Sequence, residues 1–199
     1  MSQFTRRDCL ALAAGTSAVA GLNGCATPAR ASNTDYGSGP PLHELASEKG
    51  IRFGSAMSAQ QLDDCRYCDI MVAENEHKWY TIYPDPDTVN FAPADRLVAF
   101  AVENGLTMRG HTLLWHRPQY SPKWVNELEF SSASETADFV EQKIALTADR
   151  HEPVIYAWDV VNEAIDDQTG AFRDTSLSAK MGEQLIDHAF HVAKAHAPN

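Results

Sequence analysis

Apolar residues along the chain gather in four short runs, and the longer stretches between the runs have a helical spacing of apolar positions. The runs cover residues 51–56, 70–74, 106–114 and 154–162. Short apolar runs bounded by turn residues are typical of strands buried on both faces of a parallel sheet. We therefore predict an α/β fold with four parallel strands in the order 1-2-3-4 and helices on one side, because right-handed crossovers leave few other arrangements.

Helices are predicted over residues 42–49, 93–105, 132–150 and 181–192. The first two meet a glycine at their ends, Gly50 and Gly105, and glycine commonly ends helices. The third opens with Ser132 and Glu135 in the spacing of a capping box. Each of the longer helices carries an apolar stripe, which indicates packing against the sheet.

The connection between the first two strands, Met57–Asp69, is short for a parallel crossover, which takes a dozen or more residues. It has room for one turn of helix. Cys65 and Cys68 lie within it, spaced as in a redox pair or half of a zinc site. No second Cys/His pair with ligand spacing is present, so we favour a structural role. An oxidising compartment would allow a disulfide between the two thiols.

The fourth run, Val154–Ile165, is nearly all apolar until it reaches Asn162 and Glu163. In a parallel α/β barrel the carboxyl ends of the strands open onto the active site. A glutamate placed there by an apolar strand is expected to be partly desolvated, which favours the protonated form that a general acid needs. The alternative interpretation is a strand that ends in two solvated polar residues.

Three segments together resemble family 10 of the glycoside hydrolases, the retaining endo-β-1,4-xylanases. They are Glu74–Trp79, Arg109–His116 and Trp158–Glu163, and they occur in the order found in that family. The resemblance covers roughly residues 51 to 199. It implies a (β/α)8 TIM barrel, of which residues 42–199 hold about the first four βα units, that is, the N-terminal half of the catalytic domain.

The resemblance also implies roles for individual residues. Glu163 would be the catalytic acid/base, and the substrate-binding residues would be Glu74, Asn75, Lys78, His111, Trp115 and Asn162. The implied substrate is xylan or a xylo-oligosaccharide, and no cofactor or metal is implied. His77 stands where the family commonly has methionine, and after His116 the family typically continues Ser-Gln, whereas this chain reads Arg117-Pro118-Gln119 in a longer loop. Neither His77 nor Gln119 is assigned a role.

A retaining glycosidase needs two carboxyl groups about 5–5.5 Å apart. The resemblance places the nucleophilic glutamate beyond the fourth strand, and no segment of the sequence resembles that part of the family. Asp159 begins about 13 Å deeper in the strand than Glu163, so we interpret it as a residue that orients its neighbours. We expect the isolated chain to show no measurable hydrolysis and to aggregate or dimerise through its open sheet edges.

Two other functions stay open. One is hydrolysis of β-glucans by a (β/α)8 glycosidase of a different clan that also uses an Asn-Glu pair. The amino-acid sequences of the segments around His111 and Trp158 argue against that clan. The other is a non-catalytic exported protein that binds carbohydrate or a partner through a half-barrel. A net charge of −11 argues against nucleic acid and anionic lipid as partners, because both require basic patches.

Residues 1–31 have the pattern of an export signal, with Arg6-Arg7 before a small-residue apolar run. The adjacent arginines suggest the twin-arginine route, and the run is too short for a stable membrane span. Cleavage after Ala31 would release the chain, whereas a lipobox ending at Cys25 would leave it lipid-anchored. Residues 32–41 are predicted to be a flexible tether. We therefore expect the protein to be periplasmic, extracellular or lipid-anchored.

Overall fold

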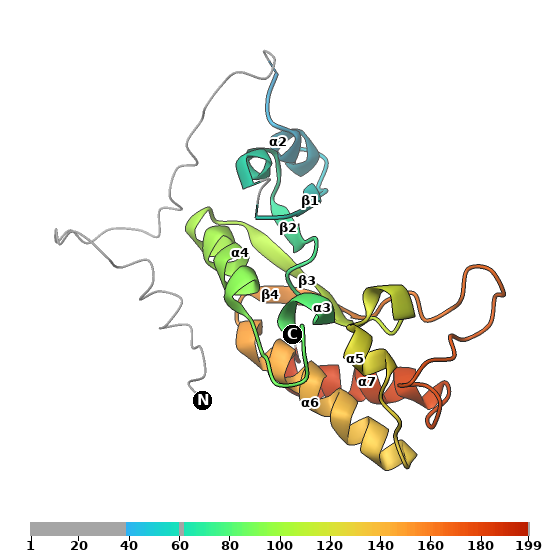
Figure 1. Ribbon diagram of the computed structural model, residues 1–199. Coiled ribbons are helices and arrows are strands. Elements are labelled where there is room, and N and C mark those ends of the chain that lie inside the picture. The colour runs from blue at the N-terminus through green and yellow to red at the C-terminus, as the bar shows by residue number, and fades with distance from the viewer. Residues whose placement is uncertain (1–38, 60–61, 199) are drawn as a thin grey trace.

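The computed structural model describes residues 39–59 and 62–198. The predicted signal, Cys25 and most of the tether lie outside these residues. In the described part a single parallel sheet has the order β1-β2-β3-β4 (Figure 1). The strands are β1 Gly54–Met57, β2 Ile70–Ala73, β3 Thr107–Leu114 and β4 Ile155–Val161. The prediction of four parallel strands in sequential order is confirmed, although β1 begins three residues later than predicted.

The helices are α2 Leu42–Ser47, η1 Leu62–Tyr67, α3 Trp79–Ile82, α4 Ala92–Glu103, η2 Pro118–Tyr120, α5 Lys123–Asn126, α6 Ala133–His151 and α7 Gln184–His196. The side chain of Ser132 accepts a hydrogen bond from the Glu135 amide at 3.2 Å, as in a capping box. The Glu135 carboxylate, however, accepts from Ser131. α7 begins later than predicted, after Gly182 adopts a φ of 56°.

Among the described residues of the short crossover between β1 and β2, the chain forms the 3-10 helix η1, whose 6 residues exceed the one turn predicted. Cys65 and Cys68 are both buried in this crossover. Both belong to the apolar cluster under β2 and α4. No group of three or more His, Cys, Asp or Glu residues that could hold a metal ion occurs among the described residues.

One face of the sheet is covered by helices. α4 contacts β2 and β3, and its Leu97 and Ala101 are fully buried with Met71 and Met108 of the sheet. α6 and α7 lie side by side and contact β3 and β4 respectively (Figure 1). In the described part of the chain, no helix is long and apolar enough to cross a membrane.

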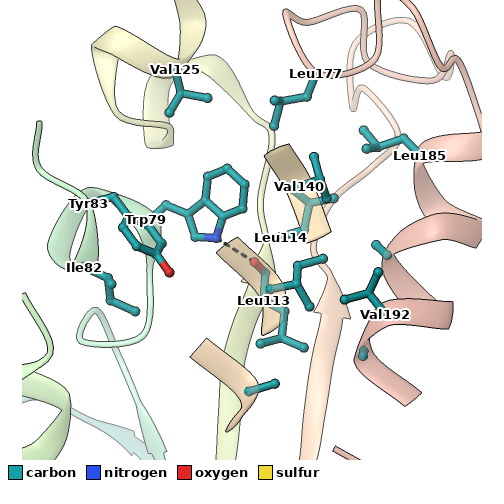
Figure 2. Close-up of a cluster of buried hydrophobic side chains, with 14 of the residues drawn as sticks. Trp79, Ile82, Tyr83, Leu113, Leu114, Val125, Val140, Leu177, Leu185 and Val192 are labelled. Atoms are coloured by element: carbon teal, nitrogen blue, oxygen red, sulfur yellow. Dashed lines mark hydrogen bonds between the residues drawn. The ribbon is translucent and has the colours of Figure 1, made fainter. Parts of the chain in front are cut away.

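A second apolar cluster fixes the segment after β2 to the end of β3. The indole Nε1 of Trp79 donates a hydrogen bond to the carbonyl oxygen of Leu113 at 2.7 Å (Figure 2). Tyr83 and Leu185 are fully buried in the same cluster. Trp79 follows the predicted site residue Lys78 directly, so this contact holds that part of the predicted site against β3.

The prediction that the fourth strand is buried on both faces is wrong for the described residues. Only Ile155 of β4 is buried, and Tyr156 next to it is 41% exposed. Successive side chains of a strand point to opposite faces. The helices cover one face, and the described residues do not cover the other.

Candidate active site

The predicted site residues gather at the carboxyl ends of three neighbouring strands. Glu74 and Asn75 follow β2, Trp115 follows β3, and Glu163 comes two residues after β4. Because the strands are parallel, these ends lie at one edge of the sheet, where barrel enzymes carry their active sites. The backbone amide of Asn162 donates to the carbonyl oxygen of Leu114 at 2.9 Å, which joins the ends of β3 and β4.

The carboxylate of Glu163 is bound from the end of β3. Its Oε2 atom accepts hydrogen bonds from Nε1 of Trp115 at 3.2 Å and from Nη1 of Arg117 at 2.9 Å. The backbone of Glu163 has a φ of 48°, a conformation that costs a non-glycine residue about 1–3 kcal/mol and is concentrated at functional sites. The expected desolvation of this side chain is not found, because it is 45% exposed. The face of the sheet that it adjoins is open in the described structure.

The Trp115 ring contacts residues on both sides of it in sequence. The Lys78 ammonium lies 4.7 Å from its centroid, within the range of a cation–π contact. Tyr120 stacks on the same indole with centroids 4.3 Å apart and planes 16° apart. Burial lowers the pKa of Lys78, while the charges of Glu74 and Glu163 oppose that shift. Lys78 therefore lies within the electrostatic reach of both predicted carboxylates.

The segment that carries Asn75 is fixed by its own hydrogen bonds. Tyr80 donates from its hydroxyl to Oδ1 of Asn75 at 2.5 Å. The carboxylate of Glu76 is buried and accepts from the backbone amides of Ala59 and Asn75. Burial raises the pKa of the Tyr80 phenol, and nearby Glu76 raises it further. The Asn75 carboxamide is thus held in one orientation at the edge of the site.

His111 lies deeper in β3 and pairs across the sheet with Asp159 of β4. Nδ1 of His111 is 2.9 Å from one carboxylate oxygen of Asp159, and Arg109 donates to the other oxygen. Burial acts to raise the pKa of Asp159, but the hydrogen bonds from Arg109 and His111 outweigh it and leave the pKa below its usual value. Asp159 therefore orients its neighbours, as predicted from its depth in the strand.

Sequence reasoning missed the arginines that organise the loop after β4. Nε of Arg173 donates to the carbonyl oxygen of Glu163 at 2.8 Å, and its Nη1 donates to Asp166 at 2.7 Å. Arg117 contacts Glu163 and, at 3.8 Å, Asp167. The lengthened loop after His116 marked the region of Arg117 and Tyr120. No sequence signal pointed to Arg173.

The site thus brings carboxylates, carboxamides and aromatic rings together at the carboxyl edge of a parallel sheet, the edge that carries the active site in β/α-barrel proteins. The sequence profile of Glycosyl hydrolase family 10 matches residues 41–199. The chain belongs to this family.

Known relatives share the fold and part of the sequence. Endo-1,4-beta-xylanase B of Paenibacillus barcinonensis is 34% identical over 169 residues, which are 80% of this chain and 50% of the relative. Its XynB crystal structure aligns with a TM-score of 0.71 over 81% of this chain and 51% of that one, at 31% identity. Xylanase 10B of Thermotoga maritima aligns with a TM-score of 0.70 over 80% and 51%, at 32% identity. The chain thus spans about half the length of these relatives and holds four strands of an eight-stranded barrel fold.

Proposed function

We propose that this chain carries the acid/base half of a retaining endo-1,4-β-xylanase site, with Glu163 as the acid/base. The observation that carries the proposal is the meeting of Glu163, Trp115 and Lys78 at one edge of the sheet. Nε1 of Trp115 donates to the Glu163 carboxylate, and the Lys78 ammonium lies over the same indole. Three segments that are distant in sequence thereby bring a carboxylate, an indole ring and an ammonium group together. A sugar-binding site uses such hydrogen-bonding groups and aromatic rings.

In the proposed reaction the protonated Glu163 gives its proton to the glycosidic oxygen as the bond to the leaving sugar breaks. The ionised Glu163 later removes a proton from the water that attacks the anomeric carbon. Asn162 would bind the sugar 2-hydroxyl, an interaction that strengthens in the transition state. The second carboxylate of such a pair is not Asp159, because Arg109 and His111 engage it deeper in the sheet.

Glu74, Asn75 and Lys78 would bind hydroxyls of the sugar on the glycone side. They offer acceptor and donor groups within five residues, and a sugar ring presents both kinds of partner. The anchoring of Trp79 to Leu113 and of Asn75 to Tyr80 supports this role, since both contacts fix the segment before substrate arrives.

The proposal is tested by extending this chain with the second half of the Paenibacillus barcinonensis xylanase and measuring release of reducing sugar. We expect the hybrid to hydrolyse xylan and the chain by itself to show no measurable hydrolysis. Carboxymethylcellulose serves as the competing substrate. A hybrid that prefers carboxymethylcellulose would indicate a β-glucanase, and a folded hybrid that binds xylo-oligosaccharides without hydrolysis would indicate a binding protein.

We propose further that the chain is exported through residues 1–31, on the evidence of Arg6-Arg7 and the apolar run that follows. Mass spectrometry of the mature protein tests this. A new N-terminus at Ser32 supports simple cleavage, and a lipidated Cys25 supports anchoring. An intact N-terminus on exported protein would contradict both.

A further inference from the structure

Four buried polar atoms belong to three rings that lie against one another between the sheet and its helices. They are the two ring nitrogens of His77, Nδ1 of His151 and the indole Nε1 of Trp158. None of them makes a hydrogen bond to any other atom of the part of the chain that the structure describes. Buried polar groups in proteins are nearly always hydrogen-bonded, so four such atoms in one place require a physical explanation.

The three rings come from elements that are distant in sequence. His77 precedes α3, His151 is the last residue of α6, and Trp158 lies in β4. The centroid of the His77 ring is 5.4 Å from that of His151, with the planes tilted by 52°. It is 5.0 Å from the centroid of Trp158, with a tilt of 58°. His77 is fully buried and His151 is 3% exposed, so bulk water does not reach either imidazole.

The neighbours of each ring determine which of these atoms donate and which accept. Nε2 of His151 lies 2.9 Å from a carboxylate oxygen of Asp95. An ionised carboxylate only accepts, so Nε2 carries the proton and Nδ1 of His151 is a bare acceptor. Burial lowers the pKa of both His77 and His151, so both rings are neutral near pH 7. Neutral His77 has one N–H donor and one bare nitrogen, and the indole Nε1 of Trp158 only donates. The group therefore offers two donors and two acceptors.

A water molecule matches this set of donors and acceptors. A buried water typically makes about three hydrogen bonds to polar groups that lack other partners. An oxygen that is hydrogen-bonded in the plane of an imidazole lies about 4 Å from the ring centroid. One oxygen can therefore reach both imidazoles when their centroids are 5.4 Å apart. A metal ion fits less well, because residues 39–59 and 62–198 contain no group of three or more His, Cys, Asp or Glu residues that could hold one.

We infer that this group is a binding site for one internal water molecule, held between β4, the end of α6 and the segment before α3. The water donates to Nδ1 of His151, accepts from Nε1 of Trp158 and bonds to one ring nitrogen of His77. Three of the four polar atoms are thereby satisfied. His77 directly precedes Lys78, so the same water fixes the segment that carries this candidate site residue. The inference does not depend on the proposed function, since it concerns the packing behind the candidate site.

The inference is tested by NMR on the ¹⁵N-labelled full chain at neutral pH. The indole N–H signals are assigned by their loss in Trp158→Phe and Trp79→Phe. We expect the Nε1 proton of Trp158 to show a rotating-frame cross-peak to water with the sign that direct contact gives and proton exchange does not. Trp79 is the control within the same protein. Its Nε1 donates to the carbonyl oxygen of Leu113 and its side chain is buried, so it should show no such cross-peak.

Substitutions at His77 test its part in the site. His77→Met replaces the ring nitrogens by an apolar side chain, and the Trp158 cross-peak to water should be lost. His77→Gln keeps a donor and an acceptor and should retain the cross-peak. His191→Met changes an exposed histidine of α7 and should leave it unchanged. A cross-peak that persists unchanged in His77→Met would overturn the inference.

A second measurement needs no variant and so does not depend on whether His77→Met folds. In a ¹H–¹⁵N spectrum of the imidazole rings, His151 should be the Nε2–H tautomer. Its bare Nδ1 should resonate upfield of a bare nitrogen that has no partner, because it accepts a hydrogen bond from the water. A His151 Nδ1 at the position of a free bare nitrogen, or a Trp158 indole proton without contact to water, would overturn the inference.

Discussion

The two faces of the sheet differ in composition and in what they do. The face toward α4 presents Met71 and Met108, both fully buried against the helix. The opposite face presents Arg109, Tyr156 and Asp159, which are polar or aromatic and partly exposed. The covered face holds the sheet and helices together by apolar packing. The open face carries the ion pairs of Asp159 with Arg109 and His111, which lie below the candidate site in β3 and β4. Stability and chemistry are thus assigned to alternate residues of the same strands.

This division predicts that the largest effect on activity comes from a residue whose loss leaves the fold intact. Glu163→Gln should lower xylan hydrolysis by the hybrid enzyme roughly a thousandfold, because it removes the proposed general acid/base. The free energy of unfolding should change by less than about 0.5 kcal/mol, since the side chain is 45% exposed. The measurements are initial rates on xylan and urea unfolding. Glu129→Gln, in an exposed loop, is the matched control, and an equal loss of rate in that variant would contradict the assignment.

On the covered side the same comparison can be made within one helix. Leu185 of α7 is fully buried, whereas Phe190 of the same helix is 52% exposed. Leu185→Ala should lower the free energy of unfolding by about 3 kcal/mol through lost burial and the cavity left behind. Phe190→Ala should change it by less than about 0.5 kcal/mol. Urea unfolding measures both, and equal effects would show that the helix does not pack as described.

Buried imidazoles make the stability of the covered side depend on pH. Burial lowers the pKa of His116 to about 4, and burial also lowers the pKa of His77 and His151. An unfolded histidine titrates near pH 6.5. The folded pKa is therefore below the unfolded one, and the stability that these neutral rings contribute is fully present above about pH 6.5 and lost as pH falls toward 4. For His116 alone the loss by pH 4.5 is about 2–3 kcal/mol.

Urea unfolding at pH 7.5, 6 and 4.5 measures this loss. Burial acts to raise the pKa of Asp95, but hydrogen bonds from Arg150 and His151 outweigh burial and leave this pKa at about 2. Asp95 therefore does not offset the loss of stability from the histidines. Its contribution is present above about pH 4 and is lost only as pH falls toward 2. His116→Gln should reduce the change in the free energy of unfolding between pH 7.5 and 4.5 by the part that His116 contributes. Stability that stays constant from pH 7.5 to 4.5 would contradict the burial of these rings as neutral species.

The sequence by itself determined the strands, their order and the edge of the sheet at which the candidate site residues gather. Apolar runs predicted four strands and their order, and the polar residues that end three of them predicted which edge carries the site. These features were readable because they depend on local periodicity and on the rule that parallel strands end together. The depth of Asp159 in its strand, found by counting residues, predicted that it orients its neighbours. The structure shows that these neighbours are Arg109 and His111.

Only the tertiary structure decided what contacts Glu163 and what covers the fourth strand. Arg117 and Glu163 are 46 positions apart in the sequence, and the chain between them passes through α5, α6 and β4 on a path that no local pattern specifies. The stacking of Tyr120 on Trp115 depends on how a lengthened loop folds back. The apolar composition of β4 predicts burial on both faces, as in a complete barrel. Its actual exposure depends on which other residues pack against it, and the sequence of the strand does not specify those residues.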